Sequence, residues 1–155
     1  MSIHFKDAEA LQTLVSEELG EWSNEVEVTQ EMINQFADLT GDHMWMHVDV
    51  ERCAKESPFK TTIAHGFLLL SMLPKMPSLP NVATIVEGYG YMMNYGSDRL
   101  RFLAPVTTGS KVHTRSRIKS VEVGAKNTKV TAETHLHAVG SDAPALIYEL
   151  VFVYM

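Results

Sequence analysis

The sequence predicts an α+β fold in which an antiparallel sheet wraps around a central apolar helix. Helical patterns occupy the first half of the chain, and long alternating patterns typical of strands occupy the second half. Between them lies a helix that is apolar on nearly every side, and such a helix is normally enclosed by other elements. With 155 residues, no internal repeat and no linker, the chain suits one domain over residues 1–155.

Three helices are expected before the central one. Apolar residues at helical spacing predict the first over Ala8–Leu19. Thr29 is a typical N-cap for a second helix that stops at Thr40-Gly41, and Asp49 is a typical N-cap for a short third helix over Val50–Lys55. Asp42 therefore lies just past the end of the second helix.

The central helix is expected from Gly66 to about Leu73, where Pro74 ends the apolar run. The remaining segments alternate between apolar and polar residues and indicate strands. These segments are Trp22–Val28, Val82–Gly88, Tyr89–Tyr95, Leu100–Leu103, Lys111–Val123, Lys126–Ala138 and Ala145–Met155. A long antiparallel sheet around one buried helix is the hot-dog fold.

Composition and charge exclude several classes of protein. The net charge of −6 argues against a general nucleic-acid binder. No apolar run approaches the roughly 20 residues that cross a bilayer, and the N-terminal segment lacks the features of a secretory signal. The single cysteine, Cys53, excludes an intrachain disulfide framework and fits a reducing compartment. We therefore expect a cytoplasmic protein without nucleic-acid or membrane partners.

The residues best suited to chemistry are Asp42, His47 and Gly66. Asp42 and His47 lie five residues apart in a turn-rich stretch, and Gly66 opens the central helix with an N–H that the first turn leaves unpaired. A carboxylate, an imidazole and a free N–H supply a proton donor, a proton acceptor and an oxyanion donor. This is the minimum needed to add or remove water beside an acyl group. Taken alone, however, Asp42 could simply cap its turn and His47 could be a half-buried loop residue.

Other chemistry is less well supported. The spacings of His43 with His47 and of His135 with His137 can serve metals, but no His-Glu-x-x-His is present, so we expect no metal site. Cys53 has no basic neighbour in sequence and is expected to be a buried structural thiol. The absence of Gly-x-Gly-x-x-Gly, Walker and Gly-x-Ser-x-Gly motifs disfavours nicotinamide cofactors, nucleotide hydrolysis and serine-hydrolase chemistry.

Several motifs together resemble the MaoC-like dehydratase family, which includes the (R)-specific enoyl-CoA hydratases. The family's Gly-Asp-x-Asn-Pro-hydrophobic-His motif is similar to Gly41–His47, which keeps the glycine, the aspartate and the histidine. Thr61–Leu68 resembles the entry to the family's central helix, and Arg101–Val112 resembles its strand, turn and strand unit. The likeness covers about residues 30 to 123.

Two departures resemble one branch of the family, the one named after nodulation protein N. Met44-Trp45 replaces the Asn-Pro of the motif, and Asn94-Tyr95-Gly96 precedes the Arg-Phe strand. These differences bear on which acyl chain fits, because the acid–base pair itself is retained.

The resemblance implies a hydro-lyase that reversibly hydrates trans-2-enoyl thioesters to 3-hydroxyacyl thioesters with (R) specificity. Asp42 and His47 would hold the reacting water, and the N–H of Gly66 would bind the thioester oxygen. The expected substrate contacts are His65, Met44, Trp45, Asn94, Tyr95 and Arg101. The resemblance further implies no cofactor beyond the coenzyme A of the substrate, an acyl-CoA or acyl-carrier-protein partner, and a homodimer.

Two rivals share the fold. A hot-dog thioesterase would hydrolyse the thioester and leave the alkene unhydrated. A non-catalytic acyl-chain binding protein would keep the pocket without turnover, although it would have no need of a desolvated carboxylate, which costs stability.

Overall fold

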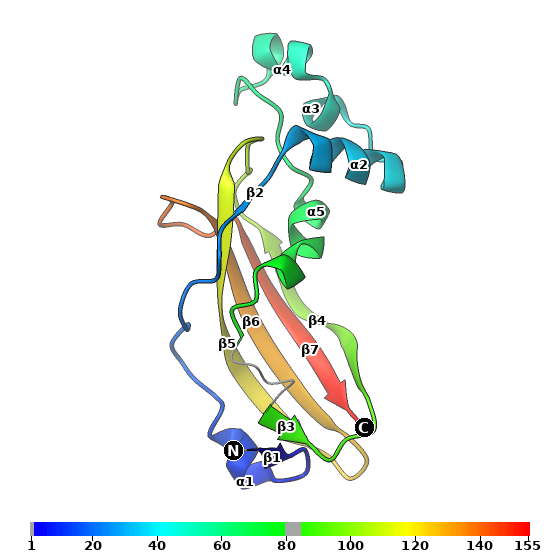
Figure 1. The fold of residues 1–155 in the computed structure, drawn as a ribbon, viewed down its shortest axis with the longest axis vertical. Coiled ribbons are helices and arrows are strands. Elements are labelled where there is room, and N and C mark those ends of the chain that lie inside the picture. Colours follow the sequence, from blue (N-terminus) through cyan, green and yellow to red (C-terminus); the bar gives the residue numbers. More distant parts are fainter. Residues whose placement is uncertain (1, 80–84) are drawn as a thin grey trace.

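The computed structural model describes residues 2–79 and 85–155, and it is built around one five-stranded antiparallel sheet (Figure 1). The strand order is β2-β5-β6-β7-β4, and helix α5 lies against one face of the sheet. This confirms the predicted α+β hot-dog architecture. The strands are β2 (Val26–Glu27), β4 (Met92–Phe102), β5 (Lys111–Val123), β6 (Thr128–Ala138) and β7 (Leu146–Tyr154).

The long strands β5, β6 and β7 lie where their alternating pattern predicts them. In β5, Val112, Thr114 and Ile118 are buried on the side of the helices, whereas the intervening residues are more exposed. Because side chains alternate across a strand, this pattern places one face of the sheet in the core. Leu136 and Leu146 add to the same core from β6 and β7.

Strand β4 differs from its prediction as two strands, Tyr89–Tyr95 and Leu100–Leu103. It is continuous and pairs with β7 throughout, with register shifts between Asn94 and Gly96 and between Ser97 and Arg99. Irregular pairing of this kind interrupts the alternating pattern without ending the strand. Among the residues that the structure describes, β4 pairs with no strand other than β7, and all its residues except Leu100 are exposed.

The helices α2 (Gln30–Thr40) and α4 (Val50–Glu56) confirm the predicted caps. The side chain of Thr29 accepts a hydrogen bond from the N–H of Met32, and that of Asp49 accepts one from the N–H of Arg52. A short helix that the sequence did not indicate, α3 (Trp45–Val48), lies between them.

The first predicted helix is much shorter than expected. Helix α1 spans only Ala8–Gln12, and the following segment runs along the edge of β5. Val15 forms a bridge with Ile118, and the N–H of Gly20 donates to the carbonyl of Ser116. Hydrogen bonding to the sheet edge thus replaces the helical continuation, and the expected strand Trp22–Val28 is reduced to β2.

A small parallel pair lies at the other end of the molecule. Strand β1 (Ile3–His4) pairs with β3 (Val86–Glu87), and β1 was not predicted. The predicted strand Val82–Gly88 begins outside the described residues.

The central helix α5 spans Gly66–Ser71 and is followed by the 3-10 turn η1 (Leu73–Lys75). Leu68 and Leu69 are buried against the sheet, whereas Phe67 is 60% exposed. The expected enclosure on nearly every side is therefore wrong for the single chain, whose sheet covers one side of the helix. Among the described residues, no helix has the length and apolarity needed to cross a membrane.

Candidate active site

Asp42 is positioned by the way α2 ends. Gly41 adopts a left-handed conformation, with φ of 80°, and its N–H donates to the carbonyl of Ala37. Glycine reaches this conformation without the steric penalty of a Cβ, so the chain turns sharply after Thr40. Asp42 follows the turn with its side chain 56% exposed, so it is less desolvated than the sequence suggested.

His47 lies on α3 with its ring buried and its orientation set by one hydrogen bond. Its Nδ1 lies 2.8 Å from the carbonyl oxygen of Ile63. A carbonyl can only accept, so Nδ1 carries the proton and, in the neutral ring, Nε2 keeps its lone pair. The backbone carbonyl of His47 in turn accepts a 2.8 Å hydrogen bond from the side chain of Gln30. His47 is therefore held as a proton acceptor through Nε2.

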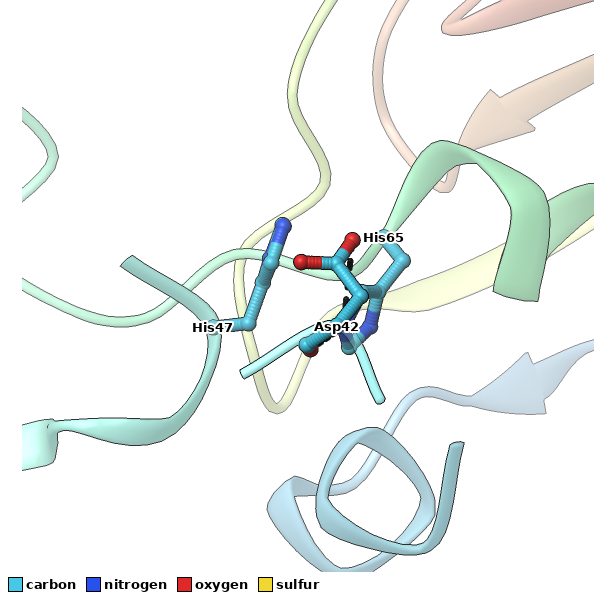
Figure 2. A group of neighbouring side chains, drawn as sticks. All are labelled: Asp42, His47 and His65. Carbon is cyan, nitrogen blue, oxygen red and sulfur yellow. Dashed lines mark hydrogen bonds and ion pairs between the residues drawn. The ribbon is translucent and has the colours of Figure 1, made fainter. Parts of the chain in front are cut away.

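His65, the residue before α5, connects the two groups. Its Nε2 donates to the backbone carbonyl of Asp42 at 2.9 Å and lies 4.0 Å from Asp42 Oδ2. Its ring stacks on that of His47, with centroids 3.8 Å apart and planes at 26°. The side chain is 3% exposed, and its Nδ1 has no hydrogen-bond partner among the described residues. Figure 2 shows the three side chains grouped where the Asp42 loop meets the start of α5.

These side chains border one pocket of about 290 Å³. Its lining is partly apolar and partly titratable, which is typical of a site that positions an organic ligand next to polar groups. The lining residues are Phe36, Thr40, Asp42, His47, His65, Gly66 and Phe67.

Gly66 supplies the remaining predicted group. As the first residue of α5 it has no intrahelical partner for its N–H, and no other acceptor bonds to that N–H within the described part of the chain. A Cβ at this position would come 2.6 Å from the ring of Phe102 on β4. Glycine therefore allows the helix to begin directly against β4.

The sequence and the fold are similar to those of known proteins. Residues 14–139 match the family model described as "MaoC like domain". Over 152 residues the chain is 41% identical to "3-hydroxyacyl-thioester dehydratase Z" of Mycobacterium tuberculosis, with 97% of each protein covered. The chain belongs to the MaoC-like dehydratase family. It is also 43% identical over 122 residues to "Nodulation protein N" of Rhizobium meliloti, which covers 77% of this chain and 73% of that protein.

Two solved structures of similar shape extend the comparison. The "Monoamine oxidase regulatory protein" of Archaeoglobus has a TM-score of 0.73 at 24% identity, covering 99% of this chain and 94% of that one. The (R)-hydratase of A. caviae has a TM-score of 0.65 at 25% identity, covering 88% and 96%. The hot-dog fold expected from the sequence is thus that of the MaoC-like proteins.

The structure separates the other predicted site residues of this MaoC-like chain. Met44 is exposed, and Trp45 packs under the guanidinium of Arg52 at 4.2 Å, so neither lines the pocket of Asp42. Asn94 lines a second, larger pocket.

Two further predicted contacts lie on the exposed strand β4. The ring of Tyr95 lies under the ammonium of Lys129 at 4.9 Å, and Arg101 donates to the carbonyl of Leu100 beside it. In the single chain, Tyr95 and Arg101 therefore stand apart from Asp42 and His47.

Sequence reasoning missed two residues of the pocket, Thr40 and Phe67. Thr40 lies about one helical turn after Phe36 on α2, and Phe36 lines the same pocket. Phe67 directly follows Gly66. Helical spacing toward Asp42, just past the end of α2, would have found Thr40, and adjacency to the start of α5 would have found Phe67.

The ligand atoms of Asp42, His47 and His65 lie within 4.8 Å of one another, close enough to be considered for a metal ion. Lone pairs of imidazole nitrogens lie in the ring plane. Because the two rings are stacked with planes at 26°, their lone pairs lie in nearly parallel planes, which disfavours their convergence on one metal ion. The geometry suits proton transfer better than tetrahedral coordination.

Cys53 is buried and lies away from this pocket. Its thiol donates to the carbonyls of Trp45 and Met46, at 3.6 and 3.7 Å. Burial raises the pKa of the thiol, which disfavours the reactive thiolate. This agrees with a structural role.

Proposed function

We propose that this protein reversibly adds water across the C2–C3 double bond of a trans-2-enoyl thioester, giving an (R)-3-hydroxyacyl thioester. The family and the relative named as a 3-hydroxyacyl-thioester dehydratase support a hydratase or dehydratase of acyl thioesters. The similar protein of A. caviae, named as an (R)-hydratase, supports the proposed stereochemistry by likeness.

One observation carries the proposal. The hydrogen bond from His47 Nδ1 to the Ile63 carbonyl leaves Nε2 as a proton acceptor, in the pocket that the Asp42 carboxyl also borders. A proton acceptor and a proton donor on the same cavity are what hydration of an alkene needs. Such a pair contributes typically about 10²–10⁴-fold to the rate.

In the proposed mechanism, Asp42 and His47 hold one water between them. The water oxygen bonds to C3 while His47 Nε2 takes one of its protons. Asp42, in its protonated form, gives a proton to C2, and the C2–C3 double bond becomes single. Transfer of the proton from His47 to Asp42 then restores the starting state, and dehydration follows the reverse order.

The thioester oxygen gains negative charge as C3 is attacked, and in the proposed mechanism the unpaired N–H of Gly66, which borders the same pocket, binds this oxygen. An oxyanion donor of this kind is typically worth about 3 kcal/mol or more. Coenzyme A, or the carrier-protein thiol, enters as part of the substrate, and no further cofactor or metal is needed for the step.

We also propose that the protein acts as a homodimer joined through β4. Ten of the eleven residues of this strand are exposed, and its outer edge has no strand partner among the described residues. Large apolar side chains, including Met93 and Tyr95, are exposed along it. A long unprotected edge of this kind readily pairs with another chain.

The test is incubation with trans-2-enoyl-CoAs from C4 to C12, following the loss of the conjugated thioester absorbance and the chirality of the product. Hydration to the (R)-3-hydroxy product supports the proposal. Release of free thiol without hydration would instead identify a thioesterase, and tight binding with no product over hours would identify an acyl-chain binding protein.

A further inference from the structure

A second pocket, of about 500 Å³, is lined by residues of the sheet, of the end of α5 and of η1. Most of its wall is apolar and comes from Leu70, Leu73, Met76, Met92, Leu150 and Phe152. Polar side chains from four strands and from the connection after η1 interrupt this wall: Ser78, Asn94, Ser116, Thr134 and Tyr148. A cavity shaped only for a hydrocarbon chain would have no need of them.

Helix α5 connects this pocket with that of Asp42. Gly66 and Phe67 border the smaller pocket, whereas Leu70 and Ser71 border the larger one. Phe67, Leu70 and Ser71 are three and four residues apart, so they lie on one side of the helix. At 1.5 Å per residue, the distance from Gly66 to Leu70 along the helix is about 6 Å. An acyl chain whose thioester lies at Gly66 and which follows this side of α5 therefore reaches the larger pocket.

Three hydroxyls form a row at the wall of the larger pocket. Ser78 Oγ lies 2.7 Å from Ser116 Oγ, which lies 2.8 Å from Thr134 Oγ1. Behind them the hydroxyl of Thr114 donates to the carbonyl of Met76 at 2.7 Å and lies 2.9 Å from Ser78 Oγ. The three pocket hydroxyls thus share two bonds among three protons.

Counting protons shows which end of the row is open. Because Thr114 gives its one proton to the Met76 carbonyl, its contact with Ser78 requires Ser78 to donate to Thr114. Ser116 then donates to Ser78 and Thr134 donates to Ser116, so the protons of the row point inward. The oxygen of Thr134 keeps a free lone pair, so Thr134 is the end that can bond a ligand, as an acceptor. A ligand hydroxyl can donate to it.

Tyr148 lies directly opposite Thr134 in the pairing of β6 with β7, and it lines the same pocket. Neither its phenol nor the amide of Asn94 has a hydrogen-bond partner among the described residues. Burial raises the pKa of the Tyr148 phenol, so the group stays protonated and can donate. A plain alkyl chain would cover these polar groups and leave them unpaired, which is costly.

Building on the hydratase function proposed above, we propose that the preferred acyl group carries a hydroxyl far from the thioester, bound by Thr134 and Tyr148. The apolar wall would hold the intervening methylenes. Shorter acyl groups would be hydrated without reaching these side chains.

The experiment compares ω-hydroxy and unsubstituted trans-2-enoyl-CoAs of equal length, from C8 to C12. For at least one length we expect kcat/KM to be about tenfold higher for the hydroxylated substrate, the size expected of one or two neutral hydrogen bonds. Thr134→Val and Tyr148→Phe should each bring the ratio toward one. Because the ratio is taken within one variant, it does not depend on how much of the enzyme is folded. Thr131→Val, a matched change outside the pocket on the same strand, should keep the wild-type ratio.

Equal kcat/KM for both substrates at every length, or a ratio that survives both variants, would overturn the inference. Turnover of the C4 substrate, which is too short to reach the pocket, tests the hydratase function separately. If that turnover is absent, calorimetry with saturated ω-hydroxyacyl-CoA and acyl-CoA still tests whether the larger pocket binds a hydroxyl. Tighter binding of the hydroxylated probe supports it, and equal binding refutes it.

Discussion

The ring of His65 stacks on the ring of His47, with centroids 3.8 Å apart, while His65 Nε2 donates to the backbone carbonyl of Asp42. One buried side chain thereby contacts both members of the proposed acid–base pair. Its position explains how a carboxyl group from a loop and an imidazole from a short helix keep a constant separation. We therefore expect His65 to act as a positioning residue.

Replacing His65 should therefore lower turnover without removing either reacting group. In His65→Phe the stacked ring is kept but the hydrogen bond to Asp42 is lost, and we expect kcat to fall about 10- to 100-fold, because small displacements of reacting groups are costly. His65→Gln, which can still donate, should recover part of the loss. Steady-state kinetics with an enoyl-CoA check this, and wild-type kcat in His65→Phe would show that the contact is only structural.

Replacing the acid–base pair itself should be far more damaging. Asp42→Asn and His47→Ala should each cut hydration by about 10²–10⁴-fold, because each removes one proton-transfer partner. The thermal unfolding midpoint of Asp42→Asn should stay near that of the wild type, since this carboxyl is more than half exposed. Near-wild-type turnover in both variants would refute the assigned roles.

Gly66→Ala should perturb the site through Phe102. The added Cβ would lie 2.6 Å from this ring, so either the ring or the start of α5 has to move. We expect a loss of at least tenfold in kcat/KM, as the N–H is displaced from the thioester oxygen. If the clash is the cause, adding Phe102→Ala to Gly66→Ala should restore part of the lost kcat/KM. This gain should be larger than any gain that Phe102→Ala gives in the wild-type protein. No recovery in the double variant would mean that Gly66 acts in another way.

His137 lies on the face of the sheet away from α5, because side chains alternate along β6. Its ring should make the free energy of unfolding depend on pH. Burial lowers the pKa of its ring, and the charges of Arg115, His135 and His113 lower it further, against a hydrogen bond to the Ser141 carbonyl. The unfolded chain then binds this proton more readily than the folded one. The stabilisation is thus complete above the ordinary histidine pKa of about 6.5 and is lost as the pH falls toward the lowered value.

Urea unfolding of the wild type and His137→Asn tests this at about pH 7.5 and pH 5.5. The wild type should lose more of its free energy of unfolding between the two values than the variant does. An identical loss in both proteins would mean that His137 is not the group responsible.

Strand β4 should be a dimer contact. Sedimentation of the wild type at micromolar concentration should give twice the mass of one chain. Tyr95→Lys together with Met93→Lys adds positive charge to the exposed strand and should shift the equilibrium toward the monomer. The lysines of the two chains would lie close together at the dimer interface and repel each other. A monomeric wild type would contradict the proposed homodimer.

Local patterns predicted the parts of the fold whose signals lie within a few residues. The caps at Thr29 and Asp49 and the turn at Gly41 were confirmed because each depends on one side chain or one backbone conformation. The alternating segments of β5 to β7 were confirmed because one face of each strand is buried. The expectation for Ala8–Leu19 failed because bonding to the edge of β5 competes with the helix, and no local pattern reports that competition.

The candidate site was likewise predicted only in part from the sequence. Sequence spacing indicated Asp42, His47 and Gly66, and the structure brings all three to the border of one pocket. The structure places Asn94 on a different pocket, and it places Tyr95 and Arg101 on an exposed strand. Their positions depend on the bulged pairing of β4 with β7, which is a long-range property.

By itself the sequence determined which elements form and which residue types are available for acid–base chemistry, because capping, alternation and residue identity act over short distances. Only the tertiary structure decided that His65 holds Asp42 and His47 together, and that Thr134 and Tyr148 face a second cavity. Those relationships join residues from separate helices and strands. They exist only once α5 has packed against the sheet and set the distances between them.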